Sequence, residues 1–244
     1  MCDKCSENLQ DQIAPSRRSA ILLAASVLGL TLTGAAFAKE TKRPPKPQNA
    51  LSPDAALKRL MQGNARYVEG VTRRHDFKHE REALVGGQNP FAAILSCADS
   101  RIAPEYAFDS GRGALFVCRV AGNFASDETI ASMEYAVAVL NTPLILVLGH
   151  ESCGAVDATL KALKDDKQPP GHIPSLVEAL APAAKAAMQR GGDTLNLAIR
   201  QNVTDNVAKL KSAAPILNAA AEQGKLKVVG GVYRLATGKV DLLA

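Results

Sequence analysis

The sequence predicts an α/β fold, with a mostly parallel central β-sheet covered by helices on both faces and an N-terminal helical arm. Short apolar runs bounded by turn residues, such as residues 91–95 and 144–148, are typical of buried parallel strands. Segments with helical periodicity separate these runs, and this alternation favours a sheet covered on both faces. Of the 244 residues 47% are hydrophobic, which suits one α/β domain with a sizeable core.

The first 38 residues have the pattern of an export signal peptide. Arg17 and Arg18 precede an apolar stretch over residues 20–32, and residues 36–38 form an A-x-A cleavage site. The paired arginines resemble a twin-arginine signal, although Ala20 stands where Phe is common. A general secretory signal and an uncleaved anchor are the alternatives. The apolar stretch is shorter than the about 20 residues that a bilayer-spanning helix needs.

This signal predicts that the mature protein acts in the periplasm. Free thiols tend to form disulfides in an oxidising compartment, whereas twin-arginine export carries folded proteins, whose thiolates can already hold a metal. The CxxC pair Cys2 and Cys5 lies in the signal and is expected to be absent after cleavage. Residues 39–50 are rich in Pro and Lys and predict a flexible linker, so that residues 51–244 form the single domain.

The composition argues against nucleic acid and membrane as partners of the mature chain. The net charge is +5, but basic residues are scattered among acidic ones. Trp is absent and aromatic residues make up 4% of the chain, which excludes an extended stacking platform for bases.

Two helices are predicted before the first strand. Ser52 as N-cap and Pro53 in the first turn begin one helix, which ends near Gly70. A second, charged helix is predicted from about Asp76 to Val85. The later helices are expected at residues 104–108, 126–140, 154–164, 174–190, 195–211 and 215–223, and the strands at 91–95, 114–118, 144–148, 226–232 and 239–243.

Chemically active side chains follow two of the predicted strands. Cys97 comes after the run 91–95, and His150 and Cys153 come after the run 144–148. Because ligands bind at the carboxyl ends of parallel strands, both motifs are expected at one edge of the sheet. Two Cys and one His can bind a tetrahedral zinc and leave a fourth position for water. The alternatives are that the two cysteines are small buried side chains or form a disulfide.

Asp99 and Arg101 lie two and four residues beyond Cys97. As a surface ion pair they would contribute roughly 0–1 kcal/mol. At a strand end, however, the Arg can hold the Asp ionised and fix its direction, so that the Asp accepts a hydrogen bond from zinc-bound hydroxide. Two thiolates cancel the charge of zinc, so bound water should be less acidic than in a three-His site, where its pKa is about 7. We therefore predict activity that rises into mildly alkaline pH.

The two motifs, Cys-Ala-Asp-Ser-Arg at 97–101 and Gly-His-x-x-Cys-Gly at 149–154, resemble those of the β-class carbonic anhydrases. The resemblance covers residues 51–243. It implies reversible hydration of CO2 to bicarbonate and a proton, by attack of zinc hydroxide on CO2. It also implies that one zinc per chain is bound by three side chains and assisted by a catalytic dyad: Cys97, His150 and Cys153, with Asp99 and Arg101.

The resemblance further implies an apolar substrate pocket across a dimer interface. By position, Gln88 would hydrogen-bond the substrate, Phe116 and Tyr135 would line the pocket, and the backbone N–H of Gly154 would lie beside it. The alternative is that Phe116 and Tyr135 are plain core and Gln88 a loop residue. A homodimer or higher homo-oligomer is therefore expected, with CO2 and bicarbonate as ligands.

Three positions depart from the commoner family pattern. Cys118 stands where an apolar residue or His is usual and is expected to be a small buried side chain rather than a fourth ligand. Glu151 stands where Ser or Thr is frequent and changes the local charge. The sequence after Arg119 differs from the subgroup in which the dyad Asp binds zinc at low pH, which favours an always-open site. Carbon disulfide hydrolysis, and a periplasmic zinc-binding or thiol-redox module, are the alternative functions.

Overall fold

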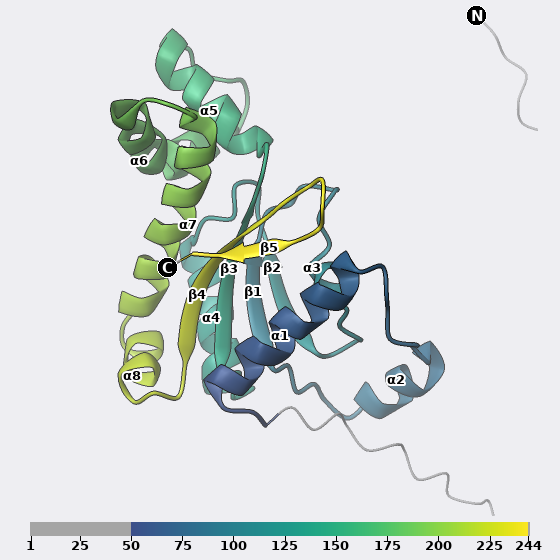
Figure 1. Cartoon of the computed structure of the whole chain (residues 1–244). Helices are drawn as coiled ribbons and strands as arrows, with labels where there is room; N and C mark the ends of the chain where they lie inside the picture. Colours follow the sequence, from purple (N-terminus) through teal and green to yellow (C-terminus); the bar gives the residue numbers. More distant parts are fainter. Residues whose placement is uncertain (1–49, 244) are drawn as a thin grey trace, which may run out of the picture. The chain divides into compact units, whose positions relative to one another are not determined.

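A five-stranded sheet forms the centre of the computed structural model, which describes residues 50–243 (Figure 1). The predicted signal peptide and nearly all of the predicted linker lie outside the described residues. The strand order is β2-β1-β3-β4-β5; the first four strands are parallel to their neighbours, and β5 is antiparallel to β4. This confirms the predicted mostly parallel sheet. The strands are β1 (Ala92–Ser96), β2 (Leu115–Arg119), β3 (Leu144–His150), β4 (Lys227–Tyr233) and β5 (Val240–Leu242).

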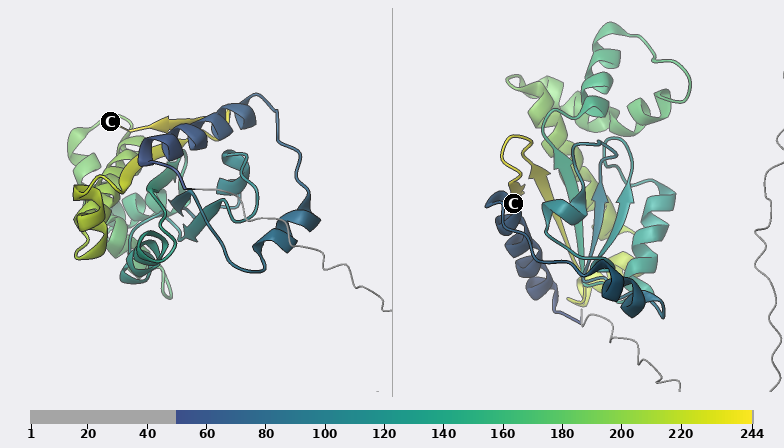
Figure 2. Two further views of the ribbon diagram at one scale, coloured as in Figure 1. Left: turned by 90° about the horizontal axis from the view of Figure 1, so that it is seen from below. Right: turned by 90° about the vertical axis from the view of Figure 1, so that its right-hand side faces the viewer.

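Helices cover both faces of the sheet, as the alternation of elements predicts (Figure 2). Their observed ends differ from the predicted ends by no more than two residues. They are α1 (Pro53–Val68), α2 (Phe77–Leu84), α3 (Pro104–Ala107), α4 (Asp127–Ala138), α5 (Gly154–Asp165), α6 (Pro174–Arg190), α7 (Thr194–Ser212) and α8 (Ile216–Glu222).

Each face of the sheet has its own hydrophobic core. Ala93 and Leu95 of β1 face the larger core, which α4 to α8 complete. Ala92 and Ile94 point to the opposite core, which α1 and α3 cover. Every residue of β1 and β3 is buried, which explains why these strands are apolar along their whole length.

Helix α1 begins as predicted and is fixed to the sheet by one buried residue. The Ser52 hydroxyl accepts a hydrogen bond from the backbone N–H of Ala55 (3.3 Å). Buried Asn64 donates to the carbonyls of Ala107 (2.9 Å) and Gly238 (2.8 Å). Its own carbonyl accepts from the backbone N–H of Val240 (2.9 Å). One side chain thereby joins α1, α3 and the turn before β5.

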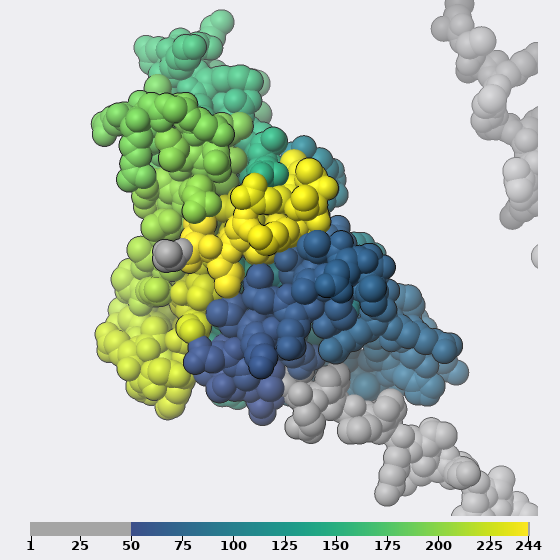
Figure 3. Space-filling model, viewed as in Figure 1, coloured from purple at the N-terminus to yellow at the C-terminus, as the bar shows by residue number. Residues whose placement is uncertain are grey.

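Helix α2 is the outer part of the predicted N-terminal arm. It has no buried residue, and its first residue, Phe77, and its C-cap, Val85, are exposed. In the space-filling view the segment with α2 projects beside α1 (Figure 3). Within residues 50–243, no helix combines the length and the apolar character needed to cross a bilayer.

Candidate metal centre

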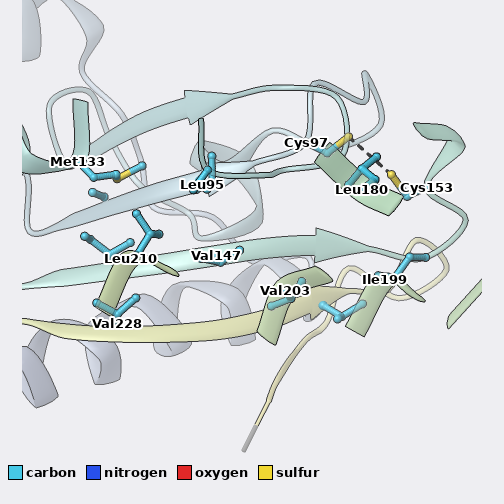
Figure 4. Packing of buried hydrophobic residues seen from close by; sticks show 14 of the residues in the cluster. Leu95, Cys97, Met133, Val147, Cys153, Leu180, Ile199, Val203, Leu210 and Val228 are labelled. Carbon is cyan, nitrogen blue, oxygen red and sulfur yellow. Dashed lines mark hydrogen bonds between the residues drawn. The ribbon is translucent and has the colours of Figure 1, made fainter. Parts of the chain in front are cut away.

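Cys97, His150 and Cys153 meet at the carboxyl edge of the sheet. Cys97 directly follows β1, His150 is the last residue of the neighbouring strand β3, and Cys153 is the N-cap of α5. The three side chains are buried, and their ligand atoms all lie within 4.8 Å of one another. Figure 4 shows the two sulfurs pointing toward each other at one end of the larger core. The structure thus brings together all three predicted metal ligands.

The distance between the two sulfurs distinguishes a metal site from a disulfide. Both thiols are free, and their Sγ atoms are 4.0 Å apart, whereas a disulfide requires about 2.05 Å. Two sulfurs bound to one tetrahedral zinc at about 2.3 Å each lie about 3.8 Å apart. The observed separation therefore fits a shared zinc ion.

The Nε2 atom of His150 lies close to the two sulfurs and can bind the same metal ion. Its Nδ1–H donates to the backbone carbonyl of Glu151 (2.8 Å), which fixes the tautomer with a free lone pair on Nε2. Nε2 is buried and makes no hydrogen bond within the described part of the chain. A buried nitrogen without a partner is costly, and coordination of a metal would remove that cost.

The two thiols share a proton in this arrangement. The hydrogen bond from Cys153 lowers the pKa of the Cys97 thiol, and the backbone N–H of Gly122 also donates to Cys97 Sγ (3.3 Å). The same bond to Cys97, together with burial, raises the pKa of Cys153. A divalent cation would replace the shared proton and stabilise both sulfurs as thiolates.

Asp99 and Arg101 form a rigid pair beside these ligands. Asp99 Oδ1 accepts from the backbone N–H and from Nε of Arg101 (2.9 Å each), and Oδ2 accepts from Nη2 (2.7 Å). The hydrogen bonds from Arg101 hold the pKa of the Asp99 carboxyl well below its ordinary value, against a smaller opposing effect of burial. Oδ2 lies 3.9 Å from His150 Nε2, so an ionised carboxylate borders the metal centre.

Arg119 holds the loop that carries Cys97 and the dyad, a role that the sequence did not reveal. Its guanidinium donates to three carbonyl groups of that loop, those of Cys97 (2.9 Å), Asp99 (2.7 Å) and Ile102 (2.9 Å). The available signal was a charged residue directly after the apolar residues of β2. That signal predicts a strand end, but not the loop to which the side chain binds.

Two buried asparagines of α7 hold the neighbouring loop, which reaches Cys97 through Gly122. Asn202 donates to the carbonyl of Gly122 (2.8 Å), and Asn206 accepts from the backbone N–H of Ala125 (2.7 Å). Asn206 also donates to Asn202 Oδ1 (2.9 Å). Their spacing of four residues on the buried side of a helix was the only sequence signal.

The structure also answers the questions raised by Glu151 and Cys118. Glu151 Oε1 lies 3.2 Å from Arg234, and Oε2 accepts from the backbone N–H of Leu235 (3.1 Å). The Glu151 carboxylate therefore connects the end of β3 to the turn between β4 and β5. Cys118 is half-buried, packs against the larger core, and burial raises the pKa of its thiol. Cys118 does not belong to the group of candidate metal ligands, which consists of Cys97, His150 and Cys153.

The predicted substrate residues fall into two groups. Gly154 begins α5 and is adjacent to Cys153. Gln88 is exposed in the loop before β1, and Phe116 pairs with Ala93 near the start of that strand. Since β1 has five residues, its first and last Cα atoms are about 13 Å apart. A single chain therefore does not bring Gln88 and Phe116 to its own metal centre.

The aromatic ring of Tyr135 lies next to that of Phe116. The centroids of their rings are 6.3 Å apart, and Tyr135 is 48% exposed on α4. Neither residue is plain core, because Phe116 is also only partly buried. The two rings form an apolar surface beside the edge strand β2.

Comparison with known sequences identifies relatives over the whole described domain. A family model described as carbonic anhydrase matches residues 92–240. The chain is 40% identical over 192 residues to "Carbonic anhydrase" of Mycolicibacterium smegmatis and to "Carbonic anhydrase 2" of Mycobacterium tuberculosis. Each match covers 78% of this chain and 93% of the relative.

Solved structures of the β class share the fold. A tetrameric β-carbonic anhydrase of Sordaria macrospora aligns with a TM-score of 0.61 at 26% identity, over 78% of this chain and 98% of that one. The Coccomyxa β-carbonic anhydrase in complex with acetazolamide aligns with a TM-score of 0.57 at 27% identity, over 78% and 82% of the two chains.

Proposed function

This chain belongs to the β class of the carbonic anhydrases, lyases whose general reaction is the hydration of CO2, and we propose that it catalyses this reaction reversibly with one zinc ion. One observation carries the zinc proposal: two free thiols and an unpartnered imidazole nitrogen converge on one buried point. The residues that would hold the ion are Cys97, His150 and Cys153. A zinc ion held there would lower the pKa of water and so supply a nucleophile at mildly alkaline pH.

Asp99 orients the attacking water. Because Arg101 keeps the carboxylate ionised, Asp99 can accept a hydrogen bond from the water but cannot donate one. Oδ2 faces the metal centre, and its lone pairs fix the direction of the O–H group. The oxygen lone pair of the water is thereby turned toward CO2.

The start of α5 stabilises the charge that develops on the product. Gly154 is the first residue of this 12-residue helix, and its backbone N–H lies next to Cys153. The positive end of a helix favours bicarbonate over uncharged CO2. Gly154 has open space where a Cβ would stand, so a small substrate can approach the backbone.

The experiment that tests this proposal is a stopped-flow assay of CO2 hydration on the mature protein, before and after a chelator. We expect one zinc per chain and loss of activity when the metal is removed. Cys153→Ser should lose both zinc and activity, whereas Cys118→Ser is the matched control and should keep both. A chelated protein with undiminished turnover, or faster turnover of CS2 than of CO2, would contradict the proposal.

We also propose that a second copy of the chain completes the substrate pocket. Gln88, Phe116 and Tyr135 lie away from the metal ligands of their own chain, near the edge strand β2, whose apolar side chains are only partly buried. In a two-fold dimer, these residues would serve the metal centre of the partner. The tetrameric relative from Sordaria macrospora is consistent with such assembly.

Mixing two inactive variants tests this shared pocket. One variant carries Asp99→Asn, and the other carries Gln88→Ala with Tyr135→Ala. If the pocket is shared, each hybrid dimer has one intact site, and an equal mixture should regain about one quarter of the unmodified rate. If each chain uses its own residues, the mixture keeps the mean of the two parental rates.

We further propose that residues 1–38 direct export to the periplasm by the twin-arginine route. The support is the sequence pattern around Arg17 and Arg18, together with thiols that benefit from binding metal before they meet an oxidant. We expect the mature chain to begin at Lys39, and Arg17→Lys with Arg18→Lys to abolish export. Recovery of that double variant from the periplasm in normal amount would refute this route.

A further inference from the structure

A second polar cavity lies away from the metal centre, near the start of β1. It has a volume of about 210 Å³, and four arginines line it: Arg59, Arg66, Arg73 and Arg74. Arg59 and Arg66 lie on α1, while Arg73 and Arg74 belong to the segment that leads to α2. We call this site the arginine cavity. Phe91, just before β1, also lines it, which places it at the opposite end of that strand from Cys97.

Both carboxylates in the arginine cavity have a bonded neighbour, although the buried Oε2 atom of Glu80 makes no hydrogen bond within residues 50–243. Asp109 accepts from Arg66 Nε (2.6 Å) and from the backbone N–H of Arg73 (3.0 Å). Glu80 Oε1 is bonded to His75 Nδ1 (2.9 Å). Four guanidinium groups against these two carboxylates leave an excess of two positive charges.

The excess positive charge is concentrated on Arg73 and Arg74. No carboxylate within residues 50–243 forms an ion pair with the guanidinium of Arg73 or Arg74. The guanidinium of Arg59 is held 4.2 Å from the ring centroid of Phe91. Burial lowers the pKa of Arg59, and the nearby charges of Arg73 and Arg66 lower it further. Cations held together in this way favour an anion between them.

We propose that the arginine cavity binds a small oxyanion, of the chemistry that phosphate and bicarbonate share. The planar, forked guanidinium group matches two oxygens of one such ion, and several guanidiniums can bind it from different sides. The volume is below the about 300–1,000 Å³ of sites for drug-sized ligands, so an inorganic ion suits it better. The site is independent of the metal ligands and of the proposed catalysis.

A bound oxyanion would fasten the N-terminal arm. It would connect α1, through Arg59, to the segment of Arg73 and Arg74 that leads into α2. Helix α2 itself buries no residue within the described chain. The ion would therefore stabilise the folded protein in proportion to its occupancy.

The experiment is a phosphate titration of the zinc-loaded mature protein, at constant ionic strength maintained with chloride. Calorimetry gives the dissociation constant, and thermal unfolding gives the shift in Tm. We expect saturable binding, weakened at least about tenfold in Arg73→Gln with Arg74→Gln. The matched control, Lys58→Gln with Lys78→Gln, removes the same charge from exposed positions of α1 and α2 and should bind like the unmodified protein.

Equal phosphate affinity in the arginine variant and the unmodified protein would overturn the proposal. A Tm shift that chloride reproduces would do the same, because it would reveal screening alone. A parallel titration with bicarbonate distinguishes the two oxyanions. CO2 hydration is measured on the same samples: phosphate binding without hydration would refute the proposed function and leave this inference standing, and hydration without binding would do the reverse.

Discussion

Two of the aspartate–arginine pairs within residues 50–243 lie at opposite ends of the sheet, and they differ in sequence separation and in exposure. Asp99 and Arg101 are two residues apart, with side chains 16% and 51% exposed. Asp109 and Arg66 are 43 residues apart, with side chains 2% and 24% exposed. The first pair lies at the carboxyl end, beside the metal centre, and the second lies in the arginine cavity.

We propose that this difference separates a pair that acts in catalysis from one that maintains the folded structure. A local pair needs little tertiary structure to form, and its exposed position leaves carboxylate lone pairs for a ligand. A long-range pair holds together segments that are distant in the sequence. Asp109, which follows α3, accepts hydrogen bonds from Arg66 on α1 and from the backbone N–H of Arg73. We therefore expect substitutions at Asp99 to affect turnover and those at Asp109 to affect folding.

The largest expected effect is that of Asp99→Asn on turnover. The amide has the size of the carboxylate but carries no charge and can donate a hydrogen bond, so it no longer selects the correct orientation of water. We expect the rate of CO2 hydration to fall roughly 10²-fold or more, with zinc content unchanged. Stopped-flow kinetics and metal analysis on one preparation measure both. An Asp99→Asn protein that keeps its rate would remove the dyad from the mechanism.

The sequence was sufficient to predict that Cys97, His150 and Cys153 come together, because their position follows from local patterns. Cys97 and His150 each end an apolar strand, and the carboxyl ends of neighbouring parallel strands meet at one edge. The pattern of apolar runs also predicted the sheet and its covering helices. These features depend on periodicity and turn residues within short windows of sequence.

The groups that support the site could not be predicted in the same way. Arg119 binds carbonyls 17 to 22 residues before it, and Asn202 binds Gly122 from 80 residues away. Backbone carbonyls are present at every position, so no residue type marks the partner. The arginine cavity is similar, because its four cations come from α1 and the following segment and gather only in the folded chain.

A smaller effect on turnover is expected from Arg119→Met. This substitution tests whether the hydrogen bonds from Arg119 to the loop after β1 position Asp99 for catalysis. The substitution keeps an unbranched side chain but leaves three carbonyls without their charged donor. We expect a loss of about 1–3 kcal/mol in the free energy of unfolding and a lower turnover number with zinc retained. Arg190→Met, at the exposed end of α6, is the control. Loss of stability without any change in turnover would show that Arg119 does not position the dyad.

The smallest effect on catalysis is expected from Asp109→Asn, which should instead change the pH dependence of stability. Burial opposes ionisation of Asp109, but the hydrogen bonds from Arg66 and from the backbone of Arg73 hold its pKa below the ordinary value. A carboxyl with a lowered pKa in the folded state stabilises the protein above its unfolded pKa of about 3.9, and this contribution is lost as the pH falls through the folded value.

At pH 7 we therefore expect Asp109→Asn to be less stable by about 1–3 kcal/mol, with turnover per zinc unchanged. The difference should stay constant down to about pH 5 and shrink below about pH 4, where the unmodified protein loses the charge that the variant lacks. Urea unfolding of both proteins at each pH measures this gap, and loss of zinc in acid affects both alike. A gap of the same size at pH 3 and pH 7 would mean that Asp109 contributes through its shape and hydrogen bonds rather than through its charge.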